Sequence, residues 1–105
     1  MSDSVKIVVT VPETDTKRLL EAIGDAGAGS IGNYTHCSFS SKGVGRFFPV
    51  DGANPAIGQI GKPEEVVEDR IEVTCNEEIL DKVISSIKLA HPYEEPVIDI
   101  YQLLT

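Results

Sequence analysis

The sequence is poor in cysteine and in basic side chains, and it has no long apolar run. Its two cysteines, Cys37 and Cys75, form no C-x-x-C pair, which excludes a disulfide-rich framework. We expect both to be buried, unreactive thiols. The 17 acidic side chains outnumber the 9 basic ones and give a formal net charge of -8. This charge opposes binding to nucleic acid and to anionic membranes, and it suits cationic partners such as metal ions.

We expect no targeting signal at the start of the chain. Met1-Ser2-Asp3-Ser4 carries no basic residue, and the apolar run that follows is too short for a signal peptide or a membrane span. We therefore expect a cytoplasmic protein without a membrane partner. The length of 105 residues and the 41 % hydrophobic content predict one globular domain, residues 1–105. Its core is modest, so association with copies of itself is a natural way to gain stability.

The chain does contain clear apolar periodicity. Alternation over residues 5–11 predicts a strand, and helical spacing from a cap at Thr14 or Asp15 to Ala26 predicts a helix. The glycines of residues 27–32 match the G-x-G-x-x-G pattern of dinucleotide sites. Here, however, they close a helix instead of opening one, so we interpret them as a helix cap and a tight loop.

The middle of the chain is less regular. Alternation over residues 34–40 predicts a second strand, in which His36 and Cys37 point to opposite faces. Residues 41–49 then predict a turn and a short hairpin extension. Residues 50–62 are rich in Gly, Pro, Asn and Ala and predict a long loop that is either mobile or engaged with a partner.

The last part of the chain repeats the strand and helix patterns. Helical spacing after a cap at Asn76 predicts a helix to Ala90, and residues 97–103 predict a final strand. Residues 65–75, which precede this helix, predict a third strand. Its core-facing residues are Ile71, Val73 and Cys75, and its outward-facing residues are Glu68, Arg70, Glu72 and Thr74.

The order strand, helix, strand, strand, helix, strand predicts an α+β, ferredoxin-like βαββαβ sandwich. This fold has a four-stranded antiparallel sheet with two helices on one face, here with a hairpin and loop extension. The other face of the sheet would be uncovered, and we interpret its mixture of apolar and charged side chains as an oligomer interface. The residues expected on this face are Lys6, Val8, Tyr34, His36, Arg70, Asp99, Tyr101 and Leu103.

The segment His91-Pro92-Tyr93-Glu94-Glu95-Pro96, here called the proline corner, joins the second helix to the last strand. Each proline fixes its own φ and disfavours a helical conformation in the residue before it, so the helix has to end at Ala90. An imidazole, a phenol and two carboxylates are thereby held on one rigid connection.

Six stretches of the sequence form a recognisable set. They are residues 27–34, Cys37-Ser38-Phe39, the glycines 43 and 45 before Phe47, Ile57-Gly58, the strand around residues 68–72 and the proline corner. This set covers nearly the whole chain and resembles the domain inserted in the Nif-three-like dinuclear-metal-centre proteins. The resemblance implies a fold similar to CutA and PII proteins and a homotrimer built through the open sheet face. CutA proteins carry a closely related His-Pro-Tyr-Glu corner before their last strand.

The dinuclear metal cluster of that family is not implied. Its ligands lie in the parts that flank the insert, and His36 and His91 are the only histidines of this sequence. We therefore expect the chain not to reproduce the cluster, and the hydrolase activity that the family name suggests does not carry over. No Ser or Cys matches a His and acid pair by spacing or by face, so a catalytic triad has no support either.

The proline corner is the candidate site. His91, Tyr93, Glu94 and Glu95, joined by His36, are the candidate ligand-binding residues, and His91, Glu94 and His36 are the candidate metal ligands. Imidazole and carboxylate suit zinc or copper, and the resemblance to CutA favours a divalent cation. The alternative is a purely structural connection in which His91 caps carbonyls and the carboxylates are solvated.

Three functional hypotheses follow. The first is a non-enzymatic oligomer that binds a divalent cation or a small ligand at the proline corner. The second is a PII-like regulatory or protein-interaction module that acts through the loop of residues 50–62. The third, an enzyme, has the least support.

Overall fold

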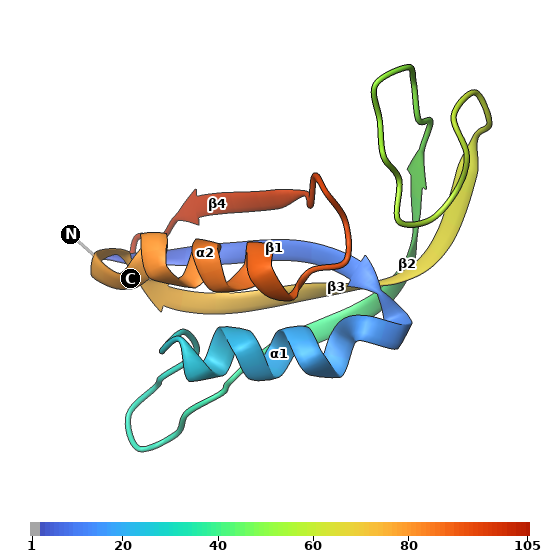
Figure 1. Ribbon diagram of the computed structural model, residues 1–105. Helices are drawn as coiled ribbons and strands as arrows, with labels where there is room; N and C mark the ends of the chain where they lie inside the picture. Colours follow the sequence, from blue (N-terminus) through green and yellow to red (C-terminus); the bar gives the residue numbers. More distant parts are fainter. Residues whose placement is uncertain (1–2) are drawn as a thin grey trace.

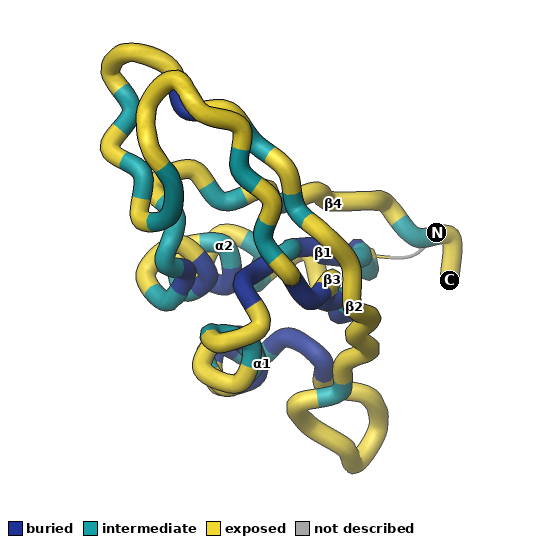
Figure 2. The backbone as a smooth tube through the Cα atoms, turned by 90° about the vertical axis from the view of Figure 1, so that its right-hand side faces the viewer, coloured by how far each residue is buried: buried dark blue, intermediate teal, exposed yellow. Residues whose placement is uncertain are grey.

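The computed structural model describes residues 3–105. Its elements follow the expected βαββαβ order, and the α+β sandwich is confirmed: the antiparallel sheet has the strand order β2-β3-β1-β4, and both helices lie on one of its faces (Figures 1 and 2). The elements are β1 (Ser4–Pro12), α1 (Thr16–Asp25), β2 (Phe39–Phe47), β3 (Glu64–Asn76), α2 (Leu80–Ala90) and β4 (Ile98–Gln102), with one 3-10 turn before each helix (Glu13–Asp15 and Glu77–Ile79).

The core lies between the sheet and the two helices, as the apolar periodicity predicts. Alternate residues of β1 and β3 point at the same stripe on α1 and α2, and each fully buried Val, Leu or Ile side chain stabilises the fold by roughly 1.5–3 kcal/mol. The central side chains, all at most 2 % exposed, are Val5, Ile7, Val9, Val11, Leu19, Ile23, Ile71, Val73, Cys75, Val83 and Ile87.

The prediction of a strand over residues 34–40 is wrong. Those residues belong mostly to a loop over residues 29–37, which backbone hydrogen bonds close and which we call the closed loop. The Gly29 N–H donates to the Thr74 carbonyl at 2.8 Å, and the Cys37 N–H donates to the Gly29 carbonyl at 2.9 Å. Between them Ile31 and Tyr34 exchange two backbone hydrogen bonds. Strand β2 therefore begins only at Phe39 and runs through residues 41–45, where we expected a turn.

The uncovered sheet face is more polar than expected. Val8 lies between Glu72 and Asp99 in the strand register and is only 5 % exposed, so it contributes no apolar surface there. Tyr101 is exposed on this face as predicted, at the β4 edge of the sheet, and Phe39 is exposed on the same face at the opposite edge, on β2. Tyr34 and His36 lie in the closed loop and not on a strand of this face.

Strands β2 and β3 continue past the end of β1. Pro12, the last residue of β1, pairs with Glu68, and beyond that point β2 and β3 pair only with each other. This two-stranded extension, residues 43–47 and 64–68, bends away from the rest of the sheet and carries the loop of residues 48–63 at its tip (Figure 1). We call it the distal ribbon. It corresponds to the predicted extension and long loop.

No helix within residues 3–105 combines the length and the apolar character needed to cross a membrane.

Candidate functional site

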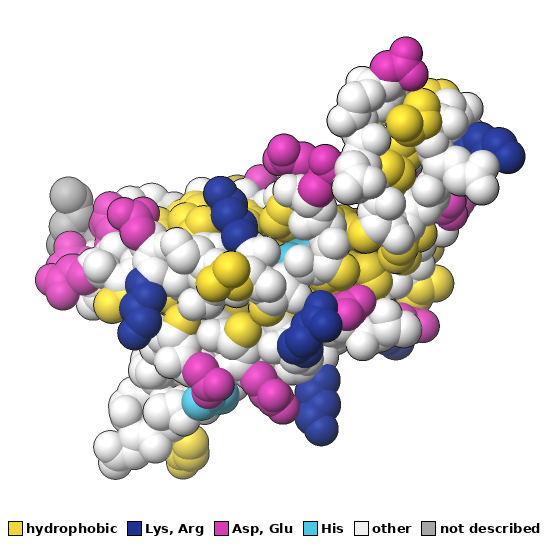
Figure 3. Space-filling view, in the orientation of Figure 1, with side chains coloured by type: hydrophobic (Ala, Val, Ile, Leu, Met, Phe, Trp, Pro, Cys, Tyr) yellow, Lys and Arg dark blue, Asp and Glu magenta, His cyan; other side chains and the backbone are white. Residues whose placement is uncertain are grey.

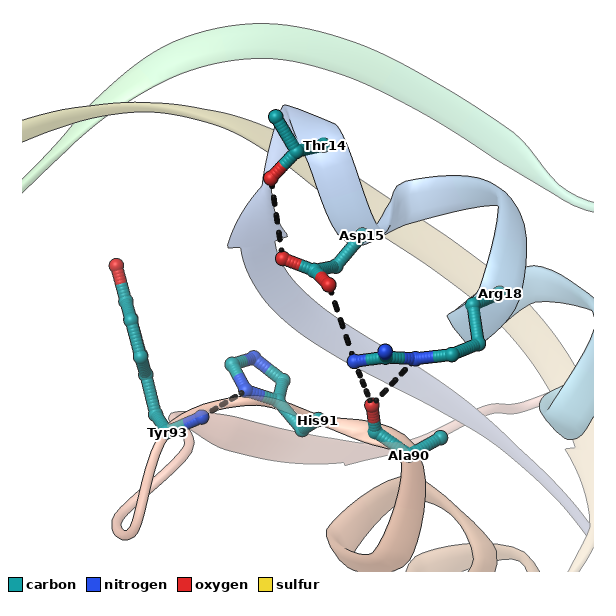
Figure 4. A network of polar contacts seen from close by, with 6 residues as sticks. All are labelled: Thr14, Asp15, Arg18, Ala90, His91 and Tyr93. Carbon is teal, nitrogen blue, oxygen red and sulfur yellow. Dashed lines mark hydrogen bonds and ion pairs between the residues drawn. The ribbon is translucent and has the colours of Figure 1, made fainter. Parts of the chain in front are cut away.

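The proline corner starts where α2 ends, at Ala90, as predicted. His91 has an extended backbone with φ -74 and ψ 136, as expected for a residue before proline. The freed carbonyl of Ala90 accepts hydrogen bonds from Nε and Nη2 of Arg18 at 3.2 and 2.8 Å, and Asp15 holds Arg18 by a 3.0 Å ion pair (Figure 4). The start of α1 thus fixes the end of α2 and positions the corner.

The imidazole of His91 is buried, and both of its nitrogens are engaged. The Tyr93 N–H donates to Nδ1 at 3.1 Å, so Nδ1 is unprotonated, and Nε2–H donates to the Thr10 carbonyl at 2.7 Å. The ring connects the corner to the end of β1. A metal ion at either nitrogen would have to replace one of these hydrogen bonds, so the position of His91 agrees better with the structural reading of this residue.

Tyr93 turns the corner towards the distal ribbon. Its hydroxyl donates a 2.8 Å hydrogen bond to Oε2 of Glu68, and its ring makes an edge contact with Phe47 at a centroid distance of 5.6 Å. Burial, and then the adjacent Glu68 carboxylate, raise the pKa of the Tyr93 phenol well above its usual range. Tyr93 is therefore a hydrogen-bond donor throughout the physiological pH range.

Glu68 corrects a second prediction. We expected it to face outward in solvent with Arg70 and Glu72, but it is only 5 % exposed, because Tyr93 covers this end of β3. Arg70 does pair with Glu72, at 3.5 Å. Gly45 on β2 provides the space for the Glu68 carboxylate: a Cβ at this glycine would collide with Oε1 of Glu68.

A pocket of about 410 Å³ opens between the proline corner and the distal ribbon; we call it the corner pocket. Oε2 of Glu94 accepts a 2.6 Å hydrogen bond from the Asn54 N–H, which ties the loop of the ribbon to the corner. Hydrophobic side chains also gather at the surface where the ribbon joins the body (Figure 3). The lining residues are Thr10, Gly45, Arg46, Phe47, Phe48, Pro49, Ala53, Pro55, Ala56, Ile57, Glu68, Tyr93, Glu94, Glu95 and Val97.

The structure brings together four of the five predicted ligand-binding residues. Tyr93, Glu94 and Glu95 line the corner pocket, and His91 lies directly behind Tyr93. His36 is elsewhere: its Nε2 pairs with Oδ1 of Asp25 at 2.9 Å, at the end of α1. Figure 3 shows the histidine colour at two separate places in this view, although most of the His91 side chain is buried.

The predicted metal ligands His91, Glu94 and His36 are not assembled into one site. Within the part of the chain that the structure describes, no three His, Cys, Asp or Glu side chains are grouped so that they could hold a metal ion. The alternation of residues 34–40 predicted His36 on a sheet face, whereas its backbone is in the left-handed region with φ 58 and the ring packs over Gly24.

Sequence reasoning missed Glu68, Phe47 and Gly45. A glycine inside a strand often marks a close approach of another group, so Gly45 could have pointed to a buried partner across the ribbon. That pattern does not identify the partner, because residues 41–45 were predicted as a turn and not as part of a strand.

The two cysteines have different environments. Cys75 is buried in the core as predicted, and burial raises the pKa of its thiol. Cys37 lies in the closed loop instead of on a strand and is only partly buried, with its Sγ 3.9 Å from the Thr35 carbonyl. The prediction of a fully buried thiol is therefore wrong for Cys37.

A second polar network lies at the base of the distal ribbon. Oδ2 of Asp69 accepts a 2.6 Å hydrogen bond from the Thr16 hydroxyl, and Oδ1 accepts one from Lys42 at 3.2 Å. Lys42 also pairs with Glu13 at 3.0 Å. The Thr16 hydrogen bond first, and then Lys42, lower the pKa of the Asp69 carboxyl. This network joins α1 to β2 and β3 just before the corner pocket.

Comparisons with known proteins identify relatives for nearly all of the chain. A protein of Halalkalibacterium halodurans named GTP cyclohydrolase 1 type 2 homolog is 50 % identical over 98 residues, which cover 93 % of this chain and 26 % of that protein. The solved Bacillus cereus protein related to NIF3 superposes with a TM-score of 0.86 at 44 % identity over 99 % of this chain and 26 % of its own. No family model matches.

A second group of solved structures shares the fold at low identity. CutA of Archaeoglobus fulgidus, described as a periplasmic divalent cation tolerance protein, superposes with a TM-score of 0.71 at 18 % identity, over 97 % of this chain and 85 % of that one. The chain therefore has a CutA-like fold. It spans about a quarter of the length of the curated relatives that it matches.

Proposed function

We propose a function for this chain as a homologue of the inserted domain of the GTP cyclohydrolase 1 type 2 and NIF3 proteins. The proposed function is that of a non-enzymatic domain that binds a small ligand in the corner pocket. The observation that carries this proposal is the pocket itself. It has the size range of small-molecule sites, apolar walls and a few convergent polar groups. Three of the residues singled out in the sequence, Tyr93, Glu94 and Glu95, line it.

The test is a ligand-observed NMR screen with a fragment set that contains amines, carboxylates and neutral compounds. Ala56→Phe places a large side chain at an exposed lining position, so we expect it to abolish the hits. Val44→Phe is the matched control, because Val44 is exposed on the same ribbon and does not line the pocket. Hits that persist in Ala56→Phe, or no hits at all with the unchanged protein, would contradict the proposal.

The proposal includes assembly as a homotrimer through the uncovered sheet face. Phe39 and Tyr101 are 67 % and 53 % exposed there, on the two edge strands β2 and β4. Among the residues that the structure describes, no helix or loop covers this face (Figure 2). Identical neighbours would remove these side chains from water and raise the stability of a small core.

A divalent cation is the less supported ligand. The Archaeoglobus CutA is a divalent cation tolerance protein by name, and Glu94 and Glu95 are exposed carboxylates. Both nitrogens of His91 are nevertheless engaged, and His36 is remote. Metal analysis of protein purified without chelator tests this ligand: a stoichiometric zinc or copper ion that is lost in His91→Ala would restore the cation as the favoured ligand.

The second candidate function is that of an interaction module acting through the loop of residues 50–62. The observation that favours it is the exposure of apolar side chains at this tip, Val50 at 64 % and Ile60 at 48 %. Shortening the loop should preserve assembly and abolish capture of a defined partner, and capture that is undiminished would count against this function.

A further inference from the structure

The floor of the corner pocket is a buried carboxylate without a compensating charge. Glu68 is 5 % exposed, and the Tyr93 hydroxyl donates a hydrogen bond to its Oε2. Within residues 3–105, no Lys, Arg or His lies within ion-pair distance of it; the nearby Arg46 pairs with Glu65 instead. A buried carboxylate is costly unless it is paired, so an unpaired one next to a cavity indicates that its partner is a ligand.

The local sequence holds this carboxylate in place. Gly45 removes the side chain that would occupy its position, and Tyr93 fixes Oε2 by a 2.8 Å hydrogen bond. Oε1 lies over Gly45, and both residues line the pocket. One oxygen is thus used for positioning, while the other can accept a hydrogen bond from a ligand.

The walls of the pocket are apolar. Phe47, Ala53, Ile57 and Val97 are among its lining residues, and the remaining acidic groups, Glu94 and Glu95, belong to the proline corner. Apolar walls exclude water and lower the local dielectric constant, which strengthens the attraction between Glu68 and a positive charge. The same walls suit an apolar ligand body.

We infer that the corner pocket binds a small organic cation, a primary ammonium or guanidinium group on an apolar body, with the charged head on Glu68 and the body along Phe47 and Ile57. This inference rests on the proposed function and adds the class of ligand. An anion would meet three carboxylates against one arginine, Arg46, which already pairs with Glu65, and a neutral compound would leave Glu68 without a counter-charge. A divalent metal requires several ligands, whereas Glu68 offers one free oxygen.

The experiment compares three probes of the same length, n-hexylammonium, n-hexanol and hexanoate, by NMR titration of the folded protein. We expect n-hexylammonium to bind about tenfold or more tightly than n-hexanol, since a buried charge pair contributes more than one neutral contact. Hexanoate should not bind. The resonances that shift should belong to the pocket lining, and Ala56→Phe should abolish the shifts.

Two acid-to-amide variants on β3 test the role of the carboxylate. Glu68→Gln keeps the size and an acceptor for Tyr93 but removes the charge, so n-hexylammonium should lose its advantage over n-hexanol. Glu72→Gln makes the same change outside the pocket and should preserve the advantage. The fold of each variant is checked by its amide spectrum, and if Glu68→Gln is misfolded, the comparison of the three probes in the unchanged protein decides.

The outcomes separate this inference from the proposed function. Equal binding of n-hexylammonium and n-hexanol, or preferred binding of hexanoate, would overturn the cation inference and leave a small-molecule pocket. An undiminished preference for n-hexylammonium in folded Glu68→Gln would also overturn it. If none of the three probes shifts a pocket resonance while the fragment screen gives pocket hits, the inference alone fails; if the screen is also empty, both fail.

Discussion

The phenol of Tyr93 donates a 2.8 Å hydrogen bond to the carboxylate of Glu68, across 25 positions of sequence. This contact joins the proline corner to the distal ribbon and forms one wall and the floor of the corner pocket. It connects a residue that the sequence singled out with one that it did not. The stability of the ribbon and the chemistry of the pocket therefore depend on the same pair.

Removal of the Tyr93 hydroxyl should destabilise the fold. In Tyr93→Phe the buried Glu68 carboxylate loses its donor, and hydrogen bonds to charged groups contribute about 1.5–3 kcal/mol. Chemical unfolding in urea measures the change. Tyr34→Phe is the control, since Tyr34 is 74 % exposed and should change stability little. Equal stability of the two variants would contradict the assigned role.

The raised pKa of Tyr93 predicts a loss of stability at alkaline pH. The folded pKa lies above the unfolded value of about 10, so the unfolded chain releases its proton first as the pH rises. The stabilisation that the protonated Tyr93 phenol contributes to the fold is fully present below a pH of about 10 and is lost progressively above it. Unfolding curves from neutral to strongly alkaline pH should fall less steeply for Tyr93→Phe than for the unchanged protein. Parallel stability curves of Tyr93→Phe and the unchanged protein over this pH range would contradict the prediction.

The two glycines of β2 should respond differently to alanine. Gly45→Ala displaces the Glu68 carboxylate and its hydrogen bond, so we expect a loss of about 1–3 kcal/mol. Gly43→Ala meets no atom within 4 Å and should be neutral or slightly stabilising. Denaturant midpoints of both variants give the answer. If the two glycines tolerate alanine equally well, Gly45 does not hold space for Glu68.

Asp69 should make the fold sensitive to acid. Its folded pKa is lowered, first by Thr16 and then by Lys42, below the unfolded value of about 3.9. Its stabilisation is therefore present above that value and is lost as the pH falls through the folded pKa. Asp69→Asn should lower stability at pH 7 and flatten the acid dependence, whereas Asp51→Asn in the exposed loop should do neither. Thermal unfolding from neutral to acidic pH measures both effects.

The uncovered sheet face should carry the assembly. Phe39→Asp places a charge on this face and should dissociate the oligomer, because a buried carboxylate without a partner is costly. Leu89→Asp makes the same change on α2, where Leu89 is 89 % exposed, and should leave assembly unchanged. Light scattering of the two variants decides. A stable monomer of the unchanged protein at micromolar concentration would remove the trimer from the proposal.

Local patterns were sufficient for most elements and insufficient at β2. Period-two alternation identified β1 and β3, and helical spacing identified α1 and α2. Each spacing places the apolar side chains on one face only if the segment adopts the matching strand or helix. Residues 34–40 alternate as well, but Gly29 holds Cys37 and Thr74 through backbone hydrogen bonds that no periodicity reveals. The error in this one strand moved His36 onto the wrong surface.

By itself, the sequence determined the fold class, the core and the end of α2, since apolar periodicity and the proline rule act within a few residues. Tertiary structure alone decided which polar groups meet. The hydrogen bond from Asn54 to Glu94 spans 40 positions and that from Thr16 to Asp69 spans 53. Such contacts depend on strand register and on the bend of the distal ribbon, and neither is encoded in the spacing of any short segment.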